Sequence, residues 1–171
     1  MKKTIVAVVA ALLLVSMTAC ALAATGFGAV GTVTNTAATA EKNGSVSGYI
    51  YTCAVTVDDA GKIVGVVFDA MQPKGSFDTT GAIVGEEKTE VVTKLEIGEG
   101  YGMKKASQIG KEWNEQMDAL SAWCVGKTLD EVLAVELDES GHTTDVDLLT
   151  GCTVHINDQL VALEKAVKSA K

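Results

Sequence analysis

Positive charge is scarce in this 171-residue chain. Lysine and arginine together number 14, against 22 aspartate and glutamate residues, and the formal net charge is −8 at pH 7. A surface this acidic repels the phosphates of nucleic acids and the headgroups of anionic lipids. The composition therefore argues against nucleic-acid binding and against purely electrostatic attachment to a membrane.

Histidine is rarer still, and neither of the two histidines has an evident catalytic partner. His142 falls in a polar turn, and no Ser/His/Asp or Cys/His arrangement has supporting context. His155 follows Cys152 at C-x-x-H spacing, but a structural zinc site takes four ligands and the chain offers one such pair. The sequence therefore predicts neither a metal site nor a hydrolase.

The chain also lacks an apolar run long enough for a comfortable membrane span. Ile5 to Val15 is apolar throughout, but a spanning helix needs ~20 such residues. With Lys2 and Lys3 ahead of it, this run is typical of an export signal. Small residues follow in two competing arrangements: an A-x-A cleavage site at residues 21–23, and a lipobox that would place a diacylglyceryl group on Cys20. Residues 1–23 are interpreted as a signal peptide, which predicts a chain outside the cytoplasm, secreted or lipid-anchored at the cell membrane.

Cysteine gives no disulfide framework. If Cys20 is lipidated or cleaved away, Cys53, Cys124 and Cys152 remain, which is an odd number. One disulfide with a free thiol, or no disulfide at all, fits this count, and we predict no bridge. Cys124 lies on an apolar stripe, so we expect it in the core rather than at a catalytic site.

About 150 residues follow the signal, enough for one domain with a real core. Residues 24–43 are mainly alanine, threonine and glycine with little bulky apolar content, and we interpret them as a flexible tether. The folded domain is expected over residues 44–171.

Strand signals dominate the first half of that domain. Residues 46–57 alternate in polarity, residues 62–70 are rich in valine and isoleucine, and Asp58 to Gly61 forms a turn between them. This pattern predicts an antiparallel hairpin. Residues 72–85 are expected to form a loop with at most a short strand, and Thr89 to Ile97 a further strand.

Helix signals dominate the second half. Residues 103–124 carry an apolar stripe at steps of three and four, Thr128 opens a short helix with a capping box, and residues 156–170 form a last amphipathic helix. Residues 144–149 are expected to form a short strand. Together the elements predict a single α+β domain, an antiparallel sheet with helices packed mainly on one face.

The most informative stretch is Asp147-Leu148-Leu149-Thr150-Gly151-Cys152-Thr153, just ahead of the last helix. One interpretation is a helix N-terminus at which Thr150 or Thr153 satisfies free backbone N–H groups. The other is a covalent attachment point for a phosphate-bearing cofactor. A second candidate is Tyr101 to Lys105, where a glycine-flanked aromatic and two lysines precede a helix. That segment is either a plain loop or a site for an anion or a planar ring.

Two parts of the chain resemble the FMN-binding domain family, which includes the flavin-carrying subunits of the sodium-pumping NADH:quinone oxidoreductase and of the Rnf complex. The hairpin with Asp58, Gly61, Lys62 and Ile63 is similar to the family's opening. The segment from Asp147 to Thr153, with the helix after it, is similar to its Asp-x-x-Ser/Thr-Gly-Ala-Thr flavinylation motif and closing helix.

The resemblance implies a site and a cofactor. Thr153 matches the threonine whose hydroxyl a dedicated flavin transferase joins to the phosphate of FMN, and Asp147, Thr150 and Gly151 match the recognition residues around it. Cys152 stands where the family has alanine. His155 stands where a hydroxyl residue is usual.

The function implied is an electron carrier outside the cytoplasm rather than a stand-alone enzyme. FMN on Thr153 would exchange electrons between a membrane redox partner and an external acceptor, and such transfer needs no acid–base pair. The departures at Cys152 and His155 motivate an alternative: a non-catalytic cell-surface binding lipoprotein that keeps the fold and has lost the flavin.

Overall fold

The computed structural model describes residues 23–87 and 89–171; Cys20 and all but the last residue of the expected signal peptide lie outside these ranges. Three long strands form an antiparallel sheet in the order β1 (Ala24–Thr36), β2 (Gly44–Val57) and β3 (Ile63–Met71). A short strand, β4 (Lys74–Phe77), pairs with the first part of β2. The predicted hairpin is therefore confirmed as β2 and β3.

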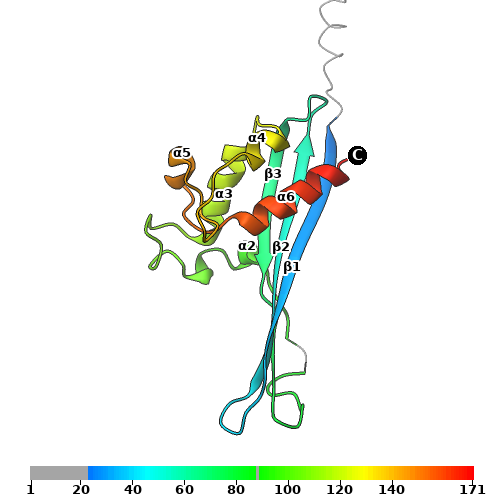
Figure 1. Cartoon of the computed structure of the whole chain (residues 1–171), viewed down its shortest axis with the longest axis vertical. Coiled ribbons are helices and arrows are strands. Elements are labelled where there is room, and N and C mark those ends of the chain that lie inside the picture. Colours follow the sequence, from blue (N-terminus) through cyan, green and yellow to red (C-terminus); the bar gives the residue numbers. More distant parts are fainter. Residues whose placement is uncertain (1–22, 88) are drawn as a thin grey trace, which may run out of the picture.

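Helices cover one face of this sheet (Figure 1). α6 (Asn157–Ser169) lies across β1 and β2, and α3 (Trp113–Cys124) packs on β3. Both helices contact the face that carries Cys53 and Phe68, which are directly paired across the sheet and buried. The shorter helices are α2 (Lys94–Ile97), the 3-10 turn η1 (Gly98–Tyr101), α4 (Leu129–Leu133) and α5 (Val146–Leu149). The prediction of a single α+β domain with helices mainly on one face is confirmed.

The opposite sheet face is open. Phe27, Ala54 and Val67 pair in one row across β1, β2 and β3, and all three side chains are exposed. Their neighbours along each strand point the other way, into the core, because side chains alternate along a strand. From Tyr51 to Val57 every second residue of β2 is buried, which reflects a sheet that is packed on one side only.

The expectation of a flexible tether over residues 24–43 is wrong, because β1 occupies most of that segment and pairs with β2 along its whole length. The backbone of α6 lies directly on β1 at Gly26 and Gly28. A Cβ atom at Gly28 would lie 2.1 Å from the carbonyl oxygen of Ala162. The small residues therefore allow close packing, and the folded domain begins at residue 24 instead of 44.

α6 also covers part of the outer edge of β1. The Oγ of Ser169 accepts the N–H of Phe27 at 3.0 Å and lies 2.9 Å from its carbonyl oxygen. The ammonium of Lys165 donates to the carbonyl oxygen of Ala29 at 2.9 Å. Edge strands expose unpaired backbone groups that invite association with other chains. Here helix side chains satisfy several of those groups.

Two strand expectations are wrong, and both segments contain a short helix instead. In the first, Thr93 and Glu96 form a capping box that starts α2 inside the range expected to be extended. In the second, the carboxylate of Asp145 accepts the N–H groups of Asp147 and Leu148 and starts α5. In each case a local side-chain cap decides the backbone conformation over the β-branched residues nearby.

The helix expected over Met103–Cys124 begins only at Trp113, and its first ten residues form a looped segment. Gly110 has a positive φ of 64°, which breaks the helical path. The buried carboxylate of Glu112 accepts the N–H groups of Met103 and Lys104, at 2.8 and 2.9 Å. The apolar stripe is present in α3, but its N-terminal part belongs to a loop that folds back on this helix.

Other local predictions are confirmed. The Thr128 capping box starts α4, residues 157–169 form the last helix, and Cys124 is fully buried. Cys53, Cys124 and Cys152 are free thiols in the core. Across residues 23–87 and 89–171, helices that combine the length and apolar character needed to cross a membrane are lacking.

Candidate functional site

The segment Asp147–Thr153 leaves α5 and runs along α3 toward α6. Neither threonine caps the N-terminus of a helix, so that interpretation is wrong; Thr150 is instead the C-cap residue of α5. The hydroxyl of Thr150 donates to the carbonyl oxygen of Asp147 at the end of α5, at 2.8 Å. The N-cap position of α6 is Ile156, which has no side-chain cap bond. The two hydroxyls therefore have roles other than starting the last helix.

Gly151 brings this segment into close contact with α3. A Cβ atom at this position would lie 2.6 Å from the Cβ of Ala119 and 3.7 Å from the Nζ of Lys111. No other residue type leaves room for the segment to approach α3 this closely. As a consequence, the positively charged ammonium of Lys111 lies beside the turn.

Cys152 and Thr153 differ in their exposure to solvent. The Cys152 side chain is fully buried, and burial raises the pKa of its thiol to about 11. Thr153 is partly exposed. The Oε1 of Gln116 accepts both the N–H of Thr153, at 2.9 Å, and its hydroxyl, at 3.3 Å. Gln116 thus fixes where the candidate acceptor hydroxyl lies.

Gln116 also joins the two segments that the sequence singled out. Its amide nitrogen donates to the Oγ of Ser107 at 3.3 Å and to the carbonyl oxygen of Lys111 at 3.2 Å. Those residues belong to the loop that follows Tyr101, and this loop is further held by Glu112. The structure therefore brings the Tyr101–Lys105 segment and Thr153 together around the first turns of α3.

A buried lysine lies on the other side of Trp113. Lys94 is only 4% exposed, and its Nζ lies 4.4 Å from the ring centroid of Tyr101 and 5.0 Å from those of Tyr49 and Trp113. The ammonium also donates to the hydroxyl of Tyr49. Cation–π contacts of this kind stabilise a charge that has left water. We call Lys94 with these three rings the aromatic cage.

A cavity adjoins the aromatic cage. Its volume is about 340 Å³, and Lys94 and Tyr101 are among the residues that line it. The remaining lining residues are Gln72, Lys74, Thr89, Glu90, Val91, Val92 and Ile97. With two lysines and one glutamate, the lining is positively charged in a chain whose overall charge is negative.

The cage continues along β2 toward the end of the motif segment. The rings of Tyr49 and Tyr51 stack with centroids 4.7 Å apart, and the Tyr51 hydroxyl lies 3.2 Å from the Nε2 of His155. Burial is the main cause that raises the pKa of both tyrosines. His155, although exposed, thus contacts the sheet through Tyr51.

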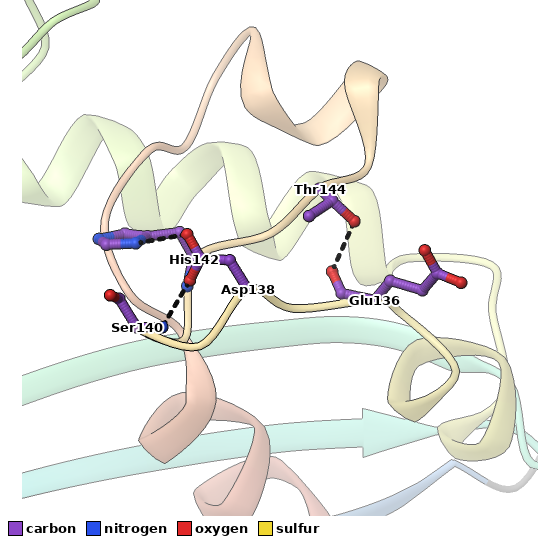
Figure 2. Close-up of polar contacts among 5 residues, drawn as sticks. All are labelled: Glu136, Asp138, Ser140, His142 and Thr144. Carbon is purple, nitrogen blue, oxygen red and sulfur yellow. Dashed lines mark hydrogen bonds and ion pairs between the residues drawn. The ribbon is translucent and has the colours of Figure 1, made fainter.

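Figure 2 shows the tight turn at Asp138 that precedes His142. The carboxylate of Asp138 accepts the N–H groups of Ser140 and His142, at 2.8 and 2.9 Å, and its other oxygen lies 3.2 Å from the Nδ1 of His142. The bond from the His142 N–H is the main cause that holds the pKa of this carboxyl below its usual value. The backbones of His142 and His155 pair in an isolated antiparallel β-bridge. The turn therefore supports the chain just after Thr153.

Sequence reasoning missed Lys94, Tyr49, Lys111, Glu112 and Gln116. Lys94 was assigned to a strand, although the Thr93–Glu96 capping box was a readable sign of a helix there. Gln116 and Glu112 carried no sequence signal, because a polar residue in a helical pattern is usually exposed. Their burial follows from the loop that folds over α3, a tertiary feature.

Replacing Gln116 by leucine should destabilise the protein by roughly 2 kcal/mol, because the N–H of Thr153 and the carbonyl of Lys111 lose their partner. The measurement is urea unfolding followed by circular dichroism. The matched control is Gln108→Leu, at an exposed position of the same loop, which should change the unfolding free energy by less than about 0.5 kcal/mol. Equal effects at the two positions would contradict the role given to Gln116.

Comparison with known proteins gives one partial similarity. The chain is 38% identical over 94 residues to the chlorophenol reductase of Desulfitobacterium hafniense, an alignment that covers 48% of this chain and 29% of that protein. The aligned segment thus spans less than a third of that relative's length. No family model matches the chain. No solved structure matches it either.

Proposed function

We propose that this chain carries FMN, joined through its phosphate to the hydroxyl of Thr153, and serves as an electron-transfer domain outside the cytoplasm. A flavin transferase would attach the cofactor, and a lipid on Cys20 would hold the domain at the membrane beside its redox partner. The observation that carries the proposal is the geometry at Thr153. Thr153 is partly exposed on a turn that a buried glutamine fixes and a lysine flanks.

The residues at this turn suit a phosphoester. The Lys111 ammonium, held beside Gly151, would offset the charge of a phosphate on the neighbouring hydroxyl. The N–H groups of Gly151 and Cys152 are both bonded to the carbonyl oxygen of Leu148. Lysine, rather than a nest of free amides, is therefore the phosphate contact. The substitution of cysteine for the family's alanine is compatible, because the Cys152 side chain points into the core.

Bound FMN would supply the electron-transfer chemistry, and the protein would hold and orient it. Gln116 sets the position of the attachment oxygen, Lys111 would offset the charge of the phosphate, and the Thr150–Asp147 bond shapes the turn ahead of them. The partial similarity to a protein named as a reductase supports a redox role.

One observation favours the alternative, a non-catalytic binding lipoprotein without flavin. The Thr153 hydroxyl already has a hydrogen-bond partner in Gln116, at 3.3 Å. Attachment of a phosphate removes that donor, although the N–H of Thr153 would keep its own bond to the same oxygen. The two functions differ in whether the hydroxyl is ever modified.

Intact mass after co-expression with a flavin transferase separates them. We expect the wild-type chain to gain the mass of FMN less one water, and Thr153→Ala to gain nothing. Thr144→Ala, which removes an exposed hydroxyl outside the motif, should be modified like the wild type. If the wild-type chain stays unmodified, the proposed carrier function is wrong and the binding lipoprotein is favoured.

A further inference from the structure

The aromatic cage holds a charge without a countercharge. Lys94 is buried, yet within residues 23–87 and 89–171 its ammonium forms no ion pair, and its one hydrogen bond goes to the Tyr49 hydroxyl. A lysine ammonium has three donors, and burying a charge is costly unless it is paired. A site that keeps such a charge beside a cavity is suited to a ligand with acceptor atoms.

The adjoining cavity has the volume and lining for a planar ring. At about 340 Å³ it falls within the usual range of small-molecule sites. Tyr101 offers an aromatic surface, Val91, Val92 and Ile97 offer apolar contacts, and Lys94 offers the charge. Gln72, Lys74, Thr89 and Glu90 complete the lining, so the cavity combines apolar contacts with several polar groups and a net positive charge. Such a mixture is the common pattern for recognising a ring that carries carbonyl oxygens on one edge.

The aromatic cage and the attachment site both contact the first turn of α3. Trp113 contacts Lys94, and Gln116, three residues later, holds Thr153. Residues three apart on a helix are surface neighbours, ≈ 5–6 Å between their Cβ atoms. The loop that carries Tyr101 is bonded to the same Gln116. A cofactor fixed at Thr153 by its phosphate would therefore have the aromatic cage close to its other end.

We propose that the cavity beside the aromatic cage binds the isoalloxazine ring of a flavin, and that Lys94 stabilises the reduced, anionic ring more than the oxidised one. The identity of the ring rests on the proposed function, but its recognition does not depend on the phosphoester. Lys94 is thus a residue that sets the redox balance of the site rather than one that only supports the fold.

Lumiflavin tests this directly, because it has the ring and methyl groups of flavin but no ribityl phosphate. We would titrate oxidised and anaerobically reduced lumiflavin into the full chain made without a flavin transferase, and follow flavin absorbance and tryptophan fluorescence. The wild type and Thr153→Ala should bind alike. Lys94→Met should weaken binding of the reduced form about tenfold more than that of the oxidised form, since only the reduced ring is charged at neutral pH.

Three variants keep the test independent of folding. Lys105→Met removes an exposed lysine of the neighbouring loop and should change neither affinity. Lys94→Arg keeps the charge and should retain the preference for the reduced ring. Val91→Trp adds bulk at an exposed position of the cavity lining and should abolish binding without disturbing the core.

The outcomes separate the two proposals. If the wild type does not bind lumiflavin, or if Lys94→Met weakens both redox forms equally, the ring site is overturned, whatever the mass experiment at Thr153 gives. If lumiflavin binds with the expected dependence on Lys94 but FMN is never attached to Thr153, the ring site stands and the covalent carrier fails.

Discussion

Gly28→Ala should destabilise the protein by roughly 3 kcal/mol, because one added methyl group would collide with the backbone of α6. Its Cβ would lie 2.1 Å from the carbonyl oxygen of Ala162 and 2.5 Å from the backbone nitrogen of Ala166. Backbone atoms in the middle of a helix cannot move aside singly, so the whole helix must lift from β1. For a domain of about this length the melting temperature should fall by roughly 6–12 °C.

The matched control is Gly65→Ala on β3, where an added Cβ has no atom within 4 Å. Both glycines lie in strands and neither has a positive φ, so the change in backbone entropy is similar. Thermal unfolding of the two variants should therefore differ by the cost of the collision alone. If Gly28→Ala and Gly65→Ala have the same melting temperature, the close packing of α6 on β1 is not present in solution.

The same glycines show why the first strand escaped prediction. Alanine, threonine and glycine have small side chains, so the composition favours a flexible tether. The alternation of Gly26 and Gly28 with Phe27 nevertheless fits a strand against which a helix packs. Only the position of α6 reveals that the small side chains face a partner. Strand β2 was predictable because its core-facing residues, Cys53 and Val55 among them, are apolar in themselves.

The residues of the candidate site also fall into those that the sequence could predict and those that depend on tertiary contacts. Thr153 and Gly151 could be singled out because they belong to a contiguous motif. Lys94, Gln116 and Tyr49 could not, because each acquires its role from a residue distant in sequence: Gln116 from Thr153, and Lys94 from three rings on different elements. Sequence patterns report local periodicity well, but buried polar contacts between distant segments leave no periodic trace.

Raising the pH above about 9 should unfold the protein steeply. Burial raises the pKa of the Cys53 and Cys124 thiols to about 12 and that of Cys152 to about 11, from a usual value of 9.0. The folded state therefore keeps these protons while the unfolded state loses them. This contribution to stability is fully present below pH 9 and is lost as the pH rises toward 11 and 12.

Each such thiol changes the unfolding free energy by up to about 1.4 kcal/mol per pH unit, and the three together give roughly 3 kcal/mol between pH 9 and 10, where the unfolded thiols are only partly ionised. The measurement is urea unfolding at intervals between pH 7 and 11. The control is a variant with Cys53→Ala, Cys124→Ala and Cys152→Ala, which is less stable at pH 7 because of the cavities it leaves. Its unfolding free energy should nevertheless be nearly constant between pH 9 and 10.

Tyr49 and Tyr51, whose pKa values are also raised, add a loss of stability above pH 10 in both proteins. Parallel curves for the two proteins below pH 10 would show that the thiols are not held in a dry core.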